Sequence, residues 1–121
     1  MAELATLARP YANAAFDLAK SAGRLDEWSR GLNLLALASE DPNLRAMIQS
    51  PTATTAEKAF KFNELFRDDL SDSVQQFVCV LAENKRLPLL AEITTQFEEK
   101  RAQEARTLDV EVTTAVSLSE T

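Results

Sequence analysis

The sequence predicts an all-α fold, a compact bundle of six helices. Apolar residues recur at helical spacing along most of the 121 residues. The chain contains only two glycines and four prolines, which is too few for the many tight turns of an all-β domain. This length is sufficient for one domain with a buried core.

The first predicted helix spans about residues 4–22 and ends at Gly23, a residue suited to the left-handed position after a helix. Pro10 lies inside it and is expected to bend it slightly. Its apolar residues cover roughly 200° of its circumference, about twice the width that packing on one core requires. The helix is therefore either deeply buried or carries a second apolar strip that serves another purpose.

Capping residues delimit the next three predicted helices. The second begins near Leu25 and carries Trp28 at a core position. The third follows Asp41-Pro42, a cap with a first-turn proline, and covers residues 43–49. Thr54 or Thr55 caps the fourth, which runs through Phe66.

The fifth predicted helix is capped by Ser71 or Asp72 and continues to about Asn84. Like the first helix, it is apolar over roughly 200° of arc. Two such helices lying side by side would leave an apolar groove, the kind of surface that binds an amphipathic helix. A central helix in a small bundle has the same pattern, so the residues alone leave both interpretations open.

The sixth predicted helix runs from about Leu89 to Ala105, and its second half is almost entirely polar. That pattern is typical of a helix that bridges domains or leaves the globule. Beyond it, Leu108, Val110 and Val112 alternate with polar residues, which predicts a strand. We therefore expect domain 1–106 to be the helical bundle, and 107–121 to be a strand-like tail entering a second domain that is missing here.

Composition argues against catalysis and several kinds of binding. The chain has no histidine and one cysteine, so we expect no catalytic residues, no metal site and no cofactor. Cys79 lies in an apolar run and is expected to be a buried structural thiol. The net charge of −6 argues against nucleic acid as a partner. No apolar run is long enough for a membrane span, so no direct membrane insertion is expected.

Three motifs, in order along the chain, resemble the delta subunit family of bacterial F-type ATP synthases, which includes the mitochondrial oligomycin sensitivity conferring protein. The motifs are Ala8-Arg9-Pro10-Tyr11-Ala12 with the following Ala14-Ala15-Phe16, then Ala82-Glu83-Asn84-Lys85-Arg86-Leu87, and finally Val110-Glu111-Val112-Thr113-Thr114-Ala115. The resemblance implies a six-helix N-terminal domain and a non-catalytic stator, or peripheral stalk, subunit of a proton-translocating ATP synthase. It also implies a place at the cytoplasmic face of the bacterial inner (plasma) membrane.

The resemblance further implies two kinds of partner. One is the N-terminal helix of the alpha subunit, held in a groove between the first and fifth helices; the others are the stalk b subunits, contacted through the missing C-terminal domain. Tyr11, Ala14 and Val80 fall where the family's groove contacts lie. Phe77 and Asn84 share the strip of Val80, and helical geometry alone adds Leu7 and Leu18. The alternative is an unrelated helical adaptor domain that binds another amphipathic helix.

Overall fold

The computed structural model describes the backbone of residues 2–120 and the side chains of residues 3–107. Its regular elements are all helical within this part of the chain. They are α1 (Ala2–Ala22), α2 (Leu25–Ala38), α3 (Pro42–Gln49), α4 (Thr55–Leu65), α5 (Asp72–Glu83), the short 3₁₀ helix η1 (Leu87–Leu89) and α6 (Leu90–Glu120). The predicted all-α bundle of six helices is thus confirmed, with α1 and α6 longer than expected.

Side-chain caps begin three of the helices as the sequence predicts. Asp41 accepts a hydrogen bond from the backbone N–H of Leu44 at 3.3 Å, which starts α3. Thr54 caps α4 and Ser71 caps α5 in the same way, each accepting from the N–H three residues ahead. These caps satisfy backbone donors that have no partner inside the helix, and they fix where each helix starts.

Two helices end in the same hydrogen-bonded turn but with different residues at its left-handed position. After α1, Gly23 has a φ of 68°, and the Arg24 N–H bonds to the Ala19 carbonyl at 2.8 Å. After α5, Lys85 takes this role with a φ of 60°, and the Arg86 N–H bonds to the Leu81 carbonyl at 2.7 Å. Gly23 was predicted, whereas Lys85 was not, because a residue with a side chain rarely adopts this conformation.

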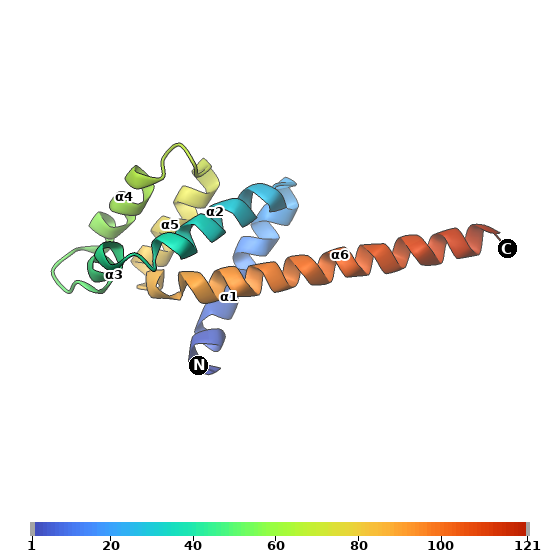
Figure 1. Ribbon diagram of the computed structural model, residues 1–121, viewed down its shortest axis with the longest axis horizontal. Coiled ribbons are helices and arrows are strands. Elements are labelled where there is room, and N and C mark those ends of the chain that lie inside the picture. Colours follow the sequence, from blue (N-terminus) through green and yellow to red (C-terminus); the bar gives the residue numbers. More distant parts are fainter. Residues whose placement is uncertain (1, 121) are drawn as a thin grey trace.

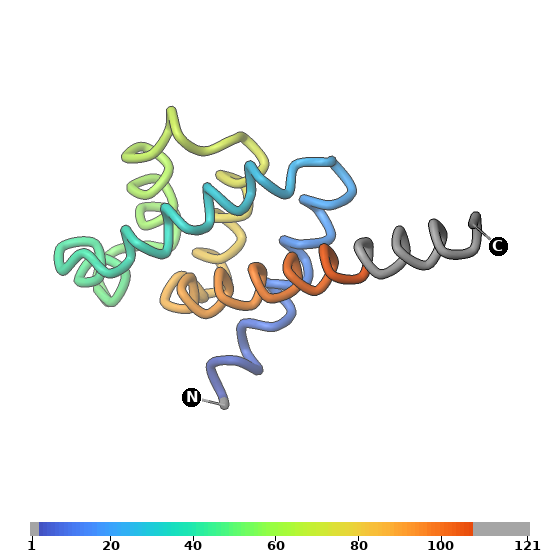
Figure 2. Tube along the Cα trace, turned by 45° about the vertical axis from the view of Figure 1, so that its right-hand side comes forward, coloured from blue at the N-terminus to red at the C-terminus, as the bar shows by residue number. Residues whose placement is uncertain are grey.

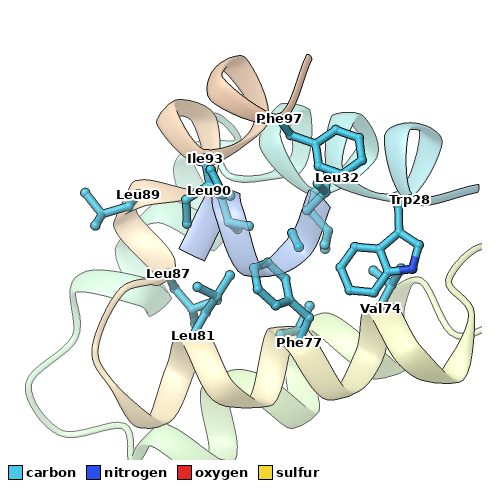
Figure 3. Close-up of a cluster of buried hydrophobic side chains, with 14 of the residues drawn as sticks. Trp28, Leu32, Val74, Phe77, Leu81, Leu87, Leu89, Leu90, Ile93 and Phe97 are labelled. Atoms are coloured by element: carbon cyan, nitrogen blue, oxygen red, sulfur yellow. The ribbon is translucent and has the colours of Figure 1, made fainter. Parts of the chain in front are cut away.

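The closest packing pairs α6 with α1 and with α2, and α4 with α5 (Figures 1 and 2). The core between them is apolar and continuous, and Trp28 is buried in it as predicted. Figure 3 shows side chains from α2, α5, η1 and α6 meeting in this core. Thr94 is buried on α6, where its hydroxyl lies 2.8 Å from the Leu90 carbonyl and 3.1 Å from that of Leu32.

The polar second half of α6 does not leave the globule immediately. Glu98 accepts hydrogen bonds from Ser29 and, at 3.2 Å, from Asn33, both on α2. Further along, Arg101 pairs with Asp26, and Glu104 lies 2.7 Å from the Lys20 ammonium. Polar side chains therefore dock this half of α6 on α1 and α2, at least as far as Glu104.

The strand predicted at residues 108–113 is wrong, because α6 remains helical to Glu120. A lone strand has no neighbour to bond its backbone groups, whereas a helix satisfies them within itself. The side chains beyond residue 107 lie outside the described part of the structure, and so does the predicted entry into a second domain.

Candidate partner-binding groove

The wide apolar arc of α1 divides into a core side and an exposed side. The core side is made of small residues and one ring, all buried: Ala8, Ala12, Ala15, Phe16 and Ala19. On the exposed side, Leu7 is 43% and Leu18 56% accessible, Ala14 is exposed, and Tyr11 is half-buried. The small core residues let α6 approach closely, so the larger apolar side chains of α1 remain on the surface.

Helix α5 divides in the same way. Five of its apolar side chains, namely Val74, Phe77, Val78, Leu81 and Ala82, are buried. Val80 points away from them and is 44% exposed. The core therefore covers only part of the apolar surface of α5, and Val80 lies on the part that remains exposed.

A depression of about 270 Å³ lies where the two exposed strips approach each other. Its lining comes from three helices: Leu18 and Ala22 of α1, Trp28 of α2, and Ser73, Gln76, Phe77 and Val80 of α5. None of these side chains carries a charge. Since α1 is packed mainly against α6 and α2, its space toward α5 remains open as a groove.

Two buried aromatic rings, Trp28 and Phe77, form the floor of this groove, and Figure 3 shows both of them in the core. Trp28 is 1% and Phe77 5% exposed, and their centroids lie 5.5 Å apart with an interplanar angle of 62°. This edge-to-face geometry is favourable for two aromatic rings. The floor is thus apolar and aromatic.

The structure brings together three of the seven predicted binding residues, Leu18, Phe77 and Val80. Leu7, Tyr11 and Ala14 lie further along α1, outside the depression but on its exposed side. Asn84 is also exposed. Its side-chain amide nitrogen donates a hydrogen bond to the Val80 carbonyl oxygen, 2.9 Å away, at the end of α5. Of the predicted set, Phe77 belongs mostly to the core and reaches the groove only as its floor.

Sequence reasoning missed four residues that line the depression, Ala22, Trp28, Ser73 and Gln76. Trp28 was assigned to the core, and it both fills the core and borders the groove. Ser73, Gln76 and Val80 repeat at intervals of three and four, which places them on one face of a helix. That spacing was available in the sequence, but it was hidden by the polar character of Ser73 and Gln76.

A larger hollow of about 530 Å³ lies at the corner between α1 and α2 and is lined mostly by charged residues. Two of its arginines are paired, Arg24 with Glu27 at 3.5 Å and Arg101 with Asp26. Both carboxylates of the lining are already paired with two of its three arginines, so we do not assign this hollow as the site. Cys79 is half-buried, with Sγ 3.6 Å from the Asn63 amide nitrogen.

The described residues provide neither a metal site nor a membrane-spanning helix. No cluster of histidine, cysteine or carboxylate side chains there has an arrangement that could bind a metal ion. None of the helices in that part of the chain combines the length and apolar character needed to cross a bilayer. The apolar groove remains the strongest candidate site.

Comparison with known proteins assigns the family. The sequence profile described as ATP synthase delta (OSCP) subunit matches residues 7–121. The chain belongs to this family. It is 40% identical to the ATP synthase subunit delta of Teredinibacter turnerae over 120 residues, which cover 99% of this chain and 67% of that relative. The ATP synthase subunit delta of Nitrosococcus oceani gives the same identity and the same coverage.

Membership of the ATP synthase delta (OSCP) family confirms the resemblance seen in the three motifs. Members of this family are structural, non-catalytic subunits of the ATP synthase complex. Membership therefore supports the role of a peripheral stalk subunit and argues against an adaptor domain of unrelated origin.

Proposed function

We propose that this chain links the catalytic head of ATP synthase to the peripheral stalk by binding the N-terminal helix of the alpha subunit between α1 and α5. In this proposal, residues 1–106 form the binding domain, and contacts with the stalk b subunits are made beyond it. The protein acts at the cytoplasmic face of the bacterial inner membrane. It serves as a stator that holds the head against the torque of the rotor.

One observation carries this proposal: the uncharged groove has exposed aliphatic side chains on both walls and an aromatic floor. Leu18 on α1 and Val80 on α5 are 56% and 44% exposed, and both border the depression above Trp28. Apolar side chains gathered around a concavity favour a partner that brings its own apolar face.

A helix is the partner segment that best fits two helices with a groove between them. Its backbone groups are already bonded internally, so it can lie on an apolar surface without leaving polar groups unsatisfied. Each Å² of apolar surface removed from water contributes about 25 cal/mol before the costs of association. Leu7, Tyr11, Ala14 and Asn84 extend the proposed contact beyond the depression.

The experiment is to titrate the full-length protein with a peptide from the N-terminus of the cognate alpha subunit and to map amide chemical shifts by NMR. We expect shifts along α1 and α5, together with helix formation in the peptide. Shifts confined to α3 and α4 would contradict the proposed site.

Ala14→Asp is the variant that separates binding from folding. Ala14 is exposed, so the carboxylate remains hydrated in the free protein, but it would be buried against the apolar face of a bound helix. We expect loss of peptide binding with unchanged helical circular dichroism. Ala56→Asp, at an exposed alanine on α4, is the matched control and should bind normally. A loss of helix content in Ala14→Asp would mean that Ala14 supports the fold instead.

A further inference from the structure

The opening turns of α1 are held differently from the rest of that helix. None of the side chains of residues 3–7 is buried, and Ala8 is the first residue of α1 in the core. Figures 1 and 2 both show this end of α1 projecting beyond α6. It nevertheless carries Leu4 and Leu7, which are 46% and 43% exposed. An apolar strip thus begins on a segment that contributes no buried side chain to the core.

Pro10 lies between this segment and the buried part of α1. Proline lacks the N–H that would continue the helical bonding pattern, and its ring presses on the preceding turn. Helices bend most readily at such a residue. The direction in which residues 2–9 point therefore depends on contacts made beyond the proline.

Gln96 of α6 supplies such a contact. Its side-chain nitrogen donates a hydrogen bond to the Ala5 carbonyl at 2.9 Å, joining residues 91 positions apart in the sequence. The same nitrogen donates to the Glu92 carboxylate at 3.2 Å. Both protons of the amide are therefore used, and Glu92, one turn earlier on α6, fixes the direction of the amide.

The hydrogen bond from Gln96 to Ala5 crosses a space between α1 and α6. A polar hollow of about 400 Å³ opens between α1 and α6, bordered by Ala5 and Arg9 on one side and by Glu92 and Gln96 on the other. Apolar packing does not fill this space, so a polar side chain must span it. Gln96 is half-buried, which protects its hydrogen bonds partly from competition with water.

We propose that Gln96, oriented by Glu92, is a positioning residue that sets the angle of the α1 segment before Pro10. By doing so it aligns Leu4 and Leu7 with the groove residues further along α1. This inference rests on the proposed function, because the alignment matters only when a partner helix lies along the strip. It assigns a binding role to a residue that does not itself line the groove.

The test compares three variants of Gln96 in the full-length protein. Gln96→Met keeps the length and helix preference of the side chain but removes its donor. Gln96→Lys restores a donor that can reach both the carbonyl and Glu92. Gln103→Ala is the control, since Gln103 borders the same hollow and is exposed.

The first measurement is hydrogen exchange of the backbone amides of residues 6–9. In Gln96→Met we expect exchange about tenfold faster, the factor corresponding to one net hydrogen bond, with no change in residues 12–22. Gln96→Lys should restore slow exchange, and Gln103→Ala should leave it unchanged. Unchanged exchange in Gln96→Met would overturn the proposal.

The second measurement is the affinity for the alpha-subunit peptide. Gln96→Met should weaken binding by about three- to tenfold. In a protein that already carries Leu4→Ser and Leu7→Ser, Gln96→Met should cause no further loss of affinity, because Gln96 acts through these two leucines. Faster exchange with unchanged affinity in Gln96→Met would also overturn the positioning role. A wild-type protein that does not bind the peptide contradicts the proposed function instead, and the exchange measurement still decides whether Gln96 holds the segment.

Discussion

Trp28 of α2 and Phe77 of α5 meet edge to face, with ring centroids 5.5 Å apart. The pair joins two helices that are otherwise in limited contact, and it lines the same depression as the exposed side chains of Leu18 and Val80. The same two rings therefore serve the core on one side and the groove on the other. Stability and binding should respond together when either ring is changed.

Phe77→Ala should lower the free energy of unfolding by about 3–5 kcal/mol, because it removes a buried ring and leaves a cavity. Phe60→Ala is the matched control, since Phe60 also lies in a helix but is 67% exposed. We expect the control to change stability by less than about 0.5 kcal/mol. Urea unfolding followed by circular dichroism measures both, and similar losses in the two variants would contradict the assignment of Phe77 to the core.

Lys85→Gly should raise the free energy of unfolding by about 0.5–1 kcal/mol. Lys85 has a φ of 60°, a conformation that costs energy for any residue with a Cβ but little for glycine. Lys61→Gly, in the exposed part of α4, should instead lower stability by about 1 kcal/mol, since glycine disfavours a helix interior. Thermal unfolding distinguishes the two, and a loss of stability in Lys85→Gly would refute the prediction.

Gly31→Leu should destabilise the contact between α2 and α5. Gly31 is buried, and a Cβ at this position would lie 3.3 Å from Val74 Cγ1 and 3.4 Å from Leu70 Cδ2. A larger side chain must push these neighbours aside, at a cost of about 1–3 kcal/mol. Arg30→Leu, at the adjacent exposed position, should have little effect on chemical denaturation, and equal effects would show that crowding is not the cause.

Glu98→Ala should cost about 1.5 kcal/mol of stability, the typical contribution of hydrogen bonds to a charged group. The substitution removes the acceptor for Ser29 and Asn33 and leaves the largely buried Ser29 hydroxyl without that partner. Glu99→Ala tests the neighbouring carboxylate, which is exposed, and should be close to neutral. Equilibrium unfolding of the pair checks this, and an equal loss in both variants would point to a general charge effect.

The features that the sequence predicted correctly are mostly local. Caps such as Thr54 and Ser71 and the helix end at Gly23 depend on chemistry within four residues. The burial of Trp28 follows from helical spacing combined with the apolar character of its ring. Such features are readable because no distant part of the chain is needed to decide them.

The features that were missed depend on distant neighbours. Glu98 lies in a segment that is polar all round, and only the presence of Ser29 and Asn33 opposite makes it a packing residue. The alternation from Leu108 to Val112 was interpreted as a strand, yet the segment continues a long helix. Gln76 lines the groove because of its position between its neighbours on α5 rather than because of its own polarity.

The incomplete packing between α1 and α5 bears on how fast the protein is degraded in the cell. A partner that binds only the folded chain stabilises it, by about 2.7 kcal/mol when its concentration is a hundred times the dissociation constant. Copies that have found their place in a complex are then opened less often than free copies, and proteases act on the opened state. With the proposed partner in the groove, a subunit whose groove is empty would be degraded faster, and its abundance would follow that of its partner.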